Sequence, residues 1–96
     1  MHVRVVRFTD VGAERLDELV SRIEESDGPP PGVPATGLTI CFDEAQGTAV
    51  VLQLFATAEA MDEGGRAFAA MDPSETPGTR VSVDMCEVKL ELQLAG

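Results

Sequence analysis

The stretch that decides the fold is residues 79–94, which read TRVSVDMCEVKLELQL. Apolar residues alternate with polar ones up to Met85, the phase slips by one residue at Cys86, and the alternation then resumes as far as Leu94. Alternation with a period of two is typical of a β-strand, and a one-residue slip indicates a β-bulge. At about 3.3 Å per residue the stretch would span about 50 Å, whereas most strands have about 5–6 residues. A small domain cannot cover such a strand alone, so we expect its distal half to pair with, or pack on, a second copy of the chain.

The length of 96 residues predicts a single domain, residues 1–96. A domain of this size hides a smaller share of its surface than a large domain does, and dimerisation would offset that shortfall.

The chain is strongly acidic, with 17 acidic and 7 basic residues and a net charge of −10. Such a field repels polyanions and anionic lipid surfaces, which argues against nucleic-acid and membrane partners. The longest apolar run, residues 49–56 with Gln53 inside it, is too short to cross a bilayer. No apolar signal-peptide region follows Met1, so we expect a cytoplasmic protein.

The first third of the chain predicts a strand, a helix and a stiff connector. Residues 2–8, HVRVVRF, are rich in β-branched residues and carry apolar side chains on both faces. The helix that follows has an apolar stripe at i, i+3, i+4 and i+7, formed by Leu16, Leu19, Val20 and Ile23. Residues 26–28 end it with a glycine, and the proline-rich residues 29–34 form a loop rather than a recognition motif for a proline-binding partner.

The middle of the chain predicts a β-hairpin. Gly37–Asp43 and Thr48–Phe55 are apolar strand segments joined by EAQG, a short loop that ends in glycine. The second of them is apolar on both faces, which predicts a central strand, and Gln53 is its one polar interruption.

A second helix follows the hairpin. Thr57 is the expected N-cap, and the helix is expected to run to about Met71 with a stripe of Met61, Gly64, Phe68 and Met71. Gly64 and Gly65 in its middle cost about 1 kcal/mol each relative to alanine. We expect them to allow a close approach to the sheet or a kink.

The resulting order is β-α-β-β-α-β, the ferredoxin-like split β-α-β arrangement with an antiparallel sheet. Both helices then pack on one face of the sheet. The other face is also largely apolar, and a second copy of the sheet is the economical cover for it.

At this point the chain resembles the dimeric α/β-barrel superfamily, which includes the antibiotic-biosynthesis-monooxygenase-like domains. The resemblance extends from residues 3–8 (VRVVRF) through residues 49–55 (AVVLQLF) to residues 79–88 (TRVSVDMCEV), and it rests on element order and the long terminal strand. It implies a dimer of two sheets closed face to face, in which the last strand reaches the partner. It also implies a ligand cavity between sheet and helices or between the two sheets.

The sequence departs from the enzymes of that superfamily in its reactive residues. Cofactor-free monooxygenases and haem-degrading members rely on combinations of Asn, Trp, His and Tyr, and this chain contains His2 alone from that set. No catalytic residue can therefore be transferred by resemblance. We also expect no cofactor and no metal, because there is one histidine and no carboxylate cluster at ligand spacing.

Polar residues inside the strands are the candidates for contacting a ligand, since buried polar groups must be paired. They are Arg4, Arg7, Thr39, Gln53 and Asp84, with Ser82 as a further polar strand residue. A pair of Arg4 or Arg7 with Asp84 could hold a polar ligand or act as a weak acid–base site, although a structural salt bridge or dimer contact is the favoured interpretation. His2 could act as a base, but a residue so near the end of the chain is more often exposed.

The two cysteines, Cys41 and Cys86, lie in apolar strand contexts and are best interpreted as small hydrophobes. The alternative is a disulfide across a dimer interface, which a reducing cytoplasm disfavours.

Two classes of function remain open. The first is a dimeric module that binds a small, partly apolar molecule, favoured because reactive residues are missing. The second is a cofactor-independent monooxygenase-like or isomerase-like enzyme acting on a small aromatic or polyketide-type substrate, with arginine and aspartate supplying electrostatics.

Overall fold

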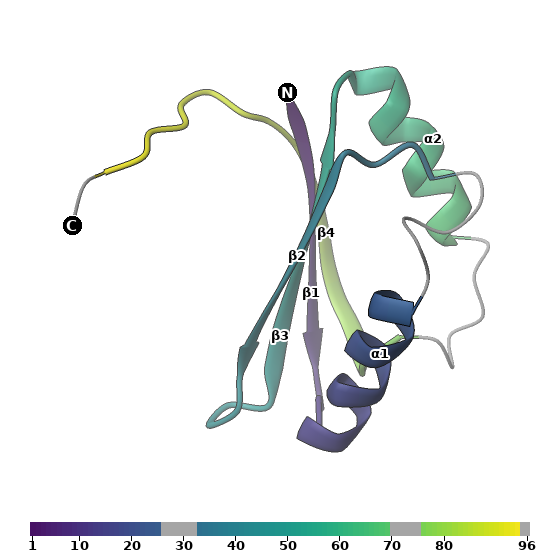
Figure 1. Cartoon of the computed structure of the whole chain (residues 1–96), viewed down its shortest axis with the longest axis vertical. Coiled ribbons are helices and arrows are strands. Elements are labelled where there is room, and N and C mark those ends of the chain that lie inside the picture. Colours follow the sequence, from purple (N-terminus) through teal and green to yellow (C-terminus); the bar gives the residue numbers. More distant parts are fainter. Residues whose placement is uncertain (26–32, 70–75, 95–96) are drawn as a thin grey trace.

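The computed structural model of the protein describes residues 1–25, 33–69 and 76–94. Six elements follow one another along the chain: β1 (His2–Thr9), α1 (Ala13–Glu25), β2 (Gly37–Asp43), β3 (Thr48–Phe55), α2 (Ala58–Ala69) and β4 (Thr79–Glu87). The strands form one antiparallel sheet in the order β2-β3-β1-β4. Both helices cover the same face of this sheet, and the opposite face is open (Figure 1). The predicted ferredoxin-like fold is confirmed, with β3 inside the sheet as expected.

Strand register assigns each side chain to one face of the sheet. The helix-facing rows of the two inner strands are buried: Arg4, Val6 and Phe8 in β1, and opposite them Gln53, Val51 and Ala49 in β3. The open face carries the intervening residues, which are half-buried and apolar except for the exposed Arg7: Val3, Val5, Val50, Leu52 and Leu54. The inner strands are therefore apolar on both faces, as the sequence predicted.

The core has two parts, one under each helix. Leu16 anchors α1 on Val6, Phe8, Ala49 and Val51, and Leu19 and Val20 pack against the same cluster. This contact uses the predicted stripe of the helix. Under α2, the buried cluster is Val33, Phe55 and Met61.

The second helix begins where the sequence predicted. The Oγ1 atom of Thr57 accepts a hydrogen bond from the backbone N–H of Ala60 at 3.0 Å, which caps the first turn. Gly64 lies directly on Phe55, since a Cβ atom at position 64 would stand 2.5 Å from Cε1 of that ring. The predicted close approach of helix and sheet is thus confirmed at Gly64, whereas the expected helix end at Met71 lies outside the described residues.

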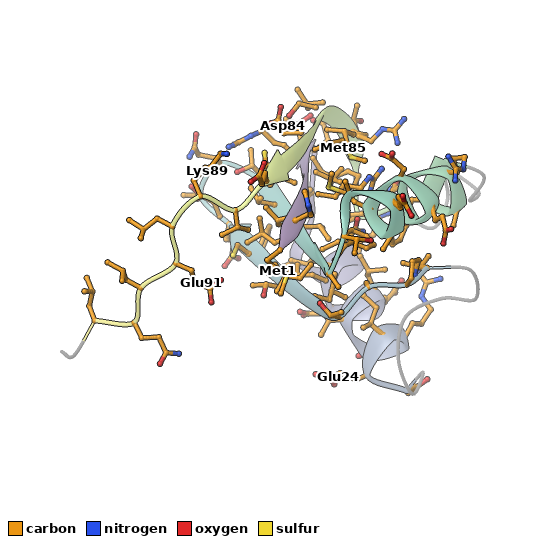
Figure 2. The ribbon with its side chains drawn as sticks, turned by 90° about the horizontal axis from the view of Figure 1, so that it is seen from above. Met1, Glu24, Asp84, Met85, Lys89 and Glu91 are labelled. Carbon is orange, nitrogen blue, oxygen red and sulfur yellow. The ribbon has the colours of Figure 1, made fainter. Side chains whose placement is uncertain are left out.

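The last strand is shorter than the sequence predicted. Pairing of β4 with β1 ends at Glu87, opposite His2, and a final bond joins the N–H of Val88 to the carbonyl of Met1 at 3.0 Å. Residues 88–94 extend beyond β1 and have no strand partner among the described residues. They leave the sheet on the side away from the helices (Figures 1 and 2).

The bulge in β4 also lies elsewhere than predicted. Register is continuous through Met85, Cys86 and Glu87, so a bulge at Cys86 is wrong. The shift instead falls where Arg7 pairs with Ser82 and Phe8 with Arg80, which leaves Val81 as the extra residue. The phase slip at Cys86 instead lies one residue before Glu87, the last residue of β4 that pairs with β1.

The predicted end of the first helix, residues 26–28, and residues 29–32 of the predicted loop 29–34 lie outside the described residues.

Among the described helices, none is long and apolar enough to cross a membrane.

Candidate functional site

Arg4 and Gln53 are the buried polar side chains of the described residues, and each is 4% exposed. Alternation along β1 and β3 points both of them toward the helices, and the register sets them directly opposite each other. The Nη1 atom of Arg4 donates a hydrogen bond of 2.9 Å to Oε1 of Gln53. The two polar interruptions of the apolar inner strands thus form one unit in an otherwise apolar layer.

Besides Gln53, three described residues lie around the Arg4 guanidinium, namely Phe68, Gly65 and Met85. Its Cζ atom lies 5.1 Å from the centroid of the Phe68 ring of α2, within the range of a cation–π contact. Gly65, also in α2, leaves space beside it: a Cβ atom there would stand 3.7 Å from Nε of Arg4 and 3.4 Å from Cε of Met85. Met85 is the β4 residue that pairs with Arg4 and lies toward α2, whereas Asp84 lies on the other side of the strand (Figure 2).

The charge of Arg4 is poorly compensated. Burial lowers the pKa of Arg4 from its ordinary value, and the positive charge of Arg80 lowers it further. A guanidinium nonetheless keeps its proton in proteins. Nε of Arg4 is buried without a hydrogen-bond partner in the described structure, so an amide and an aromatic face are what hold this cation.

The other predicted ligand residues lie on the opposite face. Arg7, Thr39 and Asp84 are exposed on the open side of the sheet, together with the half-buried Ser82. A pair between Arg4 and Asp84 is therefore wrong, because the sheet separates them. Arg7 and Asp84 share the open face, but no ion pair joins them within residues 1–25, 33–69 and 76–94.

The two cysteines share that open face. Cys41 lies opposite Val50 at the β2 edge, and Cys86 lies opposite Val3 at the β4 edge. Both thiols are free, and the two edge strands that carry them are separated by β3 and β1. A disulfide between two copies stays a hypothesis.

His2 is half-buried rather than exposed. It lies in the helix-facing row between Phe55 and Glu87, one row beyond Arg4.

Other parts of the described structure offer no comparable site. No group of three His, Cys, Asp or Glu side chains could hold a metal ion in residues 1–25, 33–69 and 76–94. A hollow of about 580 Å³ on the outer surface of α1 is open to solvent and lined by polar side chains, namely Asp17, Glu18, Ser21, Arg22 and Glu25. It lacks the apolar lining that a partly apolar ligand needs.

Sequence reasoning found Arg4 and Gln53 but not the residues around them. Phe68 was assigned to the helix core by its spacing, and Met85 to the strand alternation. The glycine pair in the middle of α2 was the available signal, because its cost in helix propensity calls for a reason.

The comparisons with known proteins concern the fold. No family model matches the sequence, and no curated protein is similar to it. Two crystal structures match over 100% of this chain and 100% of their own chains. One is a mutant of MhuD with two manganese protoporphyrin IX molecules bound per active site, at 18% identity and a TM-score of 0.58. The other is described as "a putative antibiotic biosynthesis monooxygenase" from Deinococcus radiodurans, at 15% identity and a TM-score of 0.55. The chain therefore shares the fold of these two proteins, a ferredoxin-like α+β fold.

Proposed function

We propose that the protein is a homodimeric module that binds a small, partly apolar molecule in the layer between the sheet and α2. The observation that carries this proposal is the buried Arg4–Gln53 pair in an apolar layer. A buried guanidinium costs free energy that neither an amide nor an aromatic ring fully restores. A ligand that completes its hydrogen bonds accounts for its presence better than packing does.

One of the two structural neighbours supports a ligand of this kind. The MhuD mutant holds manganese protoporphyrin IX, a large and mostly apolar molecule, on the same fold. In this chain Phe68 and Met85 provide the apolar surface beside the polar pair.

The homodimer is supported by the open face and the last residues. Val3, Val5, Val50, Leu52 and Leu54 form an apolar surface that no described element covers. On the same side, residues 88–94 carry exposed leucines: Leu90 at 75%, Leu92 at 68% and Leu94 at 86%. Their alternation with polar residues suits a strand, and a second copy of the chain offers both a face and an edge for it.

Binding is favoured over catalysis because reactive residues are scarce. The chain has one histidine and no Trp, Tyr or Asn. The second candidate is a cofactor-independent oxygenase or isomerase, favoured by the name of the Deinococcus radiodurans neighbour and by the ability of Arg4 to stabilise a developing anion.

Native mass spectrometry of the protein as purified, followed by thermal unfolding with added aromatic compounds, tests the proposal. We expect a dimer and a rise in Tm, since a ligand that binds only the folded state stabilises it. A monomer whose Tm no compound changes contradicts the proposal. Oxygen uptake with a hydroquinone, lost in Arg4→Met, would instead support the enzyme.

A further inference from the structure

Within residues 1–25, 33–69 and 76–94 no counter-ion faces the charge of Arg4, although the chain is rich in acidic residues. The sequence holds 17 acidic residues, yet none pairs with Arg4 in the described structure. Among the described residues, the charged group that acts on the pKa of Arg4 is another cation, Arg80 of β4. A buried positive charge is costly until an opposite charge joins it, so this position favours an anion from outside the chain.

The donors of Arg4 leave one edge of its guanidinium for such an anion. Gln53 occupies Nη1, whereas Nε is buried and without a partner among the described residues. Nε and Nη2 form the side edge of the planar fork, which matches the two oxygens of a carboxylate.

The two glycines of α2 differ in whether packing requires them, and this difference identifies the space for the anion. At Gly64 a Cβ atom would stand 2.5 and 2.7 Å from atoms of the Phe55 ring, so packing excludes any side chain. At Gly65 it would stand 3.4 Å from Met85 and 3.7 Å from Nε of Arg4, which is ordinary contact. Packing therefore does not require Gly65, although glycine in a helix costs stability. A methyl group at position 65 would fill the space beside Nε of Arg4, which has no partner among the described residues.

An apolar surface leads to this space from the edge of the sheet. Met85 and Val83 lie on the helix-facing side of β4, paired with Arg4 and Val6, and remain 43% and 37% exposed. The Phe68 ring of α2 also contacts the guanidinium and adds to this apolar surface.

We propose that Arg4 selects an anionic ligand: the carboxylate or other oxyanion of a partly apolar molecule binds at the Nε–Nη2 edge, in the space left by Gly65, while its apolar part lies on Phe68 and Met85. This inference rests on the proposed binding function and names the ligand class of that same site.

A matched pair of compounds tests it, 1-naphthoate and its neutral amide, 1-naphthamide, each titrated calorimetrically into the full chain. We expect naphthoate to bind at least about tenfold more tightly, since hydrogen bonds to charged groups are among the strong ones. The ¹⁵N–H signal of Arg4 Nε, assigned by its loss in Arg4→Met, should shift with naphthoate and stay in place with the amide.

Two variants and a control complete the test. Arg4→Met should weaken naphthoate binding about tenfold or more and leave amide binding unchanged, whereas Gly65→Ala, which fills the space beside Arg4, should weaken both. Arg15→Met, on the exposed surface of α1, should change neither. If Arg4→Met does not fold, Gly65→Ala and the ratio of the two affinities in the unchanged protein decide. Equal affinity for both compounds, or an Nε signal that ignores naphthoate, overturns the anion inference and leaves the binding function standing. Binding of neither compound overturns both.

Discussion

Arg4 gives the clearest prediction among single residues, because a ligand site and a structural pair respond differently to its loss. Replacing a buried charged group and its partner by apolar residues of similar size often stabilises a protein by about 1–4 kcal/mol. We expect the double variant Arg4→Met with Gln53→Leu to raise the free energy of unfolding by about 1 kcal/mol or more, measured in urea at fixed protein concentration.

The single change Gln53→Leu is the control for that experiment. It leaves Nη1 of Arg4 buried without its acceptor, so the free energy of unfolding should fall by about 1–3 kcal/mol. A double variant as unstable as this single one would mean that Arg4 and Gln53 belong to the fold and not to a ligand.

Gly64 and Gly65 predict opposite effects for the same substitution at adjacent positions. Gly64→Ala should destabilise, because its Cβ atom would overlap the Phe55 ring. Gly65→Ala should stabilise by about 1 kcal/mol through helix propensity. Thermal unfolding of the two variants without ligand measures both, and a loss of Tm in Gly65→Ala would show that the space beside Arg4 is needed for packing.

The candidate site could be predicted only in part from single residues. Arg4 and Gln53 stand out because each interrupts an apolar strand, and the alternation of β1 already separates Arg4 from Arg7. Which face the helices cover follows from tertiary packing, so the sequence could not say that Arg7, Thr39 and Asp84 lie together on the open side.

At the scale of elements, the N-cap of α2 is the feature with the most direct test. Thr57→Ala removes the acceptor for the Ala60 N–H and should lower the free energy of unfolding by about 1 kcal/mol. Thr57→Ser keeps the hydroxyl oxygen and should retain most of the stability. Equal losses in the two variants would indicate that the methyl group of threonine, not the cap, matters.

Element order was predictable because each segment carries its own pattern, such as the apolar stripe of α1. The hairpin loop between β2 and β3 ends in Gly47, whose φ of 65° suits glycine. The last strand was harder. Val81, Val83 and Met85 keep their alternation through the true bulge, so the bulge left no trace in the sequence. Alternation past Glu87 shows that a strand could form there but not which chain pairs with it.

At the scale of the whole molecule, residues 88–94 predict how the proposed dimer forms. Replacing Leu90, Leu92 and Leu94 by serine should convert the dimer to a monomer, seen as a halved mass in light scattering after gel filtration. The matched control replaces the polar residues Lys89, Glu91 and Gln93 by serine, and this variant should remain a dimer. A dimer in both variants would leave the open sheet face as the interface without the segment.

The unpaired segment has a further consequence for the lifetime of the protein. In a lone chain, residues 88–94 present an extended backbone with large apolar side chains, which is the form that proteases cleave most readily. Once covered by a second copy, the same backbone would be protected. Degradation by proteases would then slow as the concentration rises, because a larger share of the copies would be assembled.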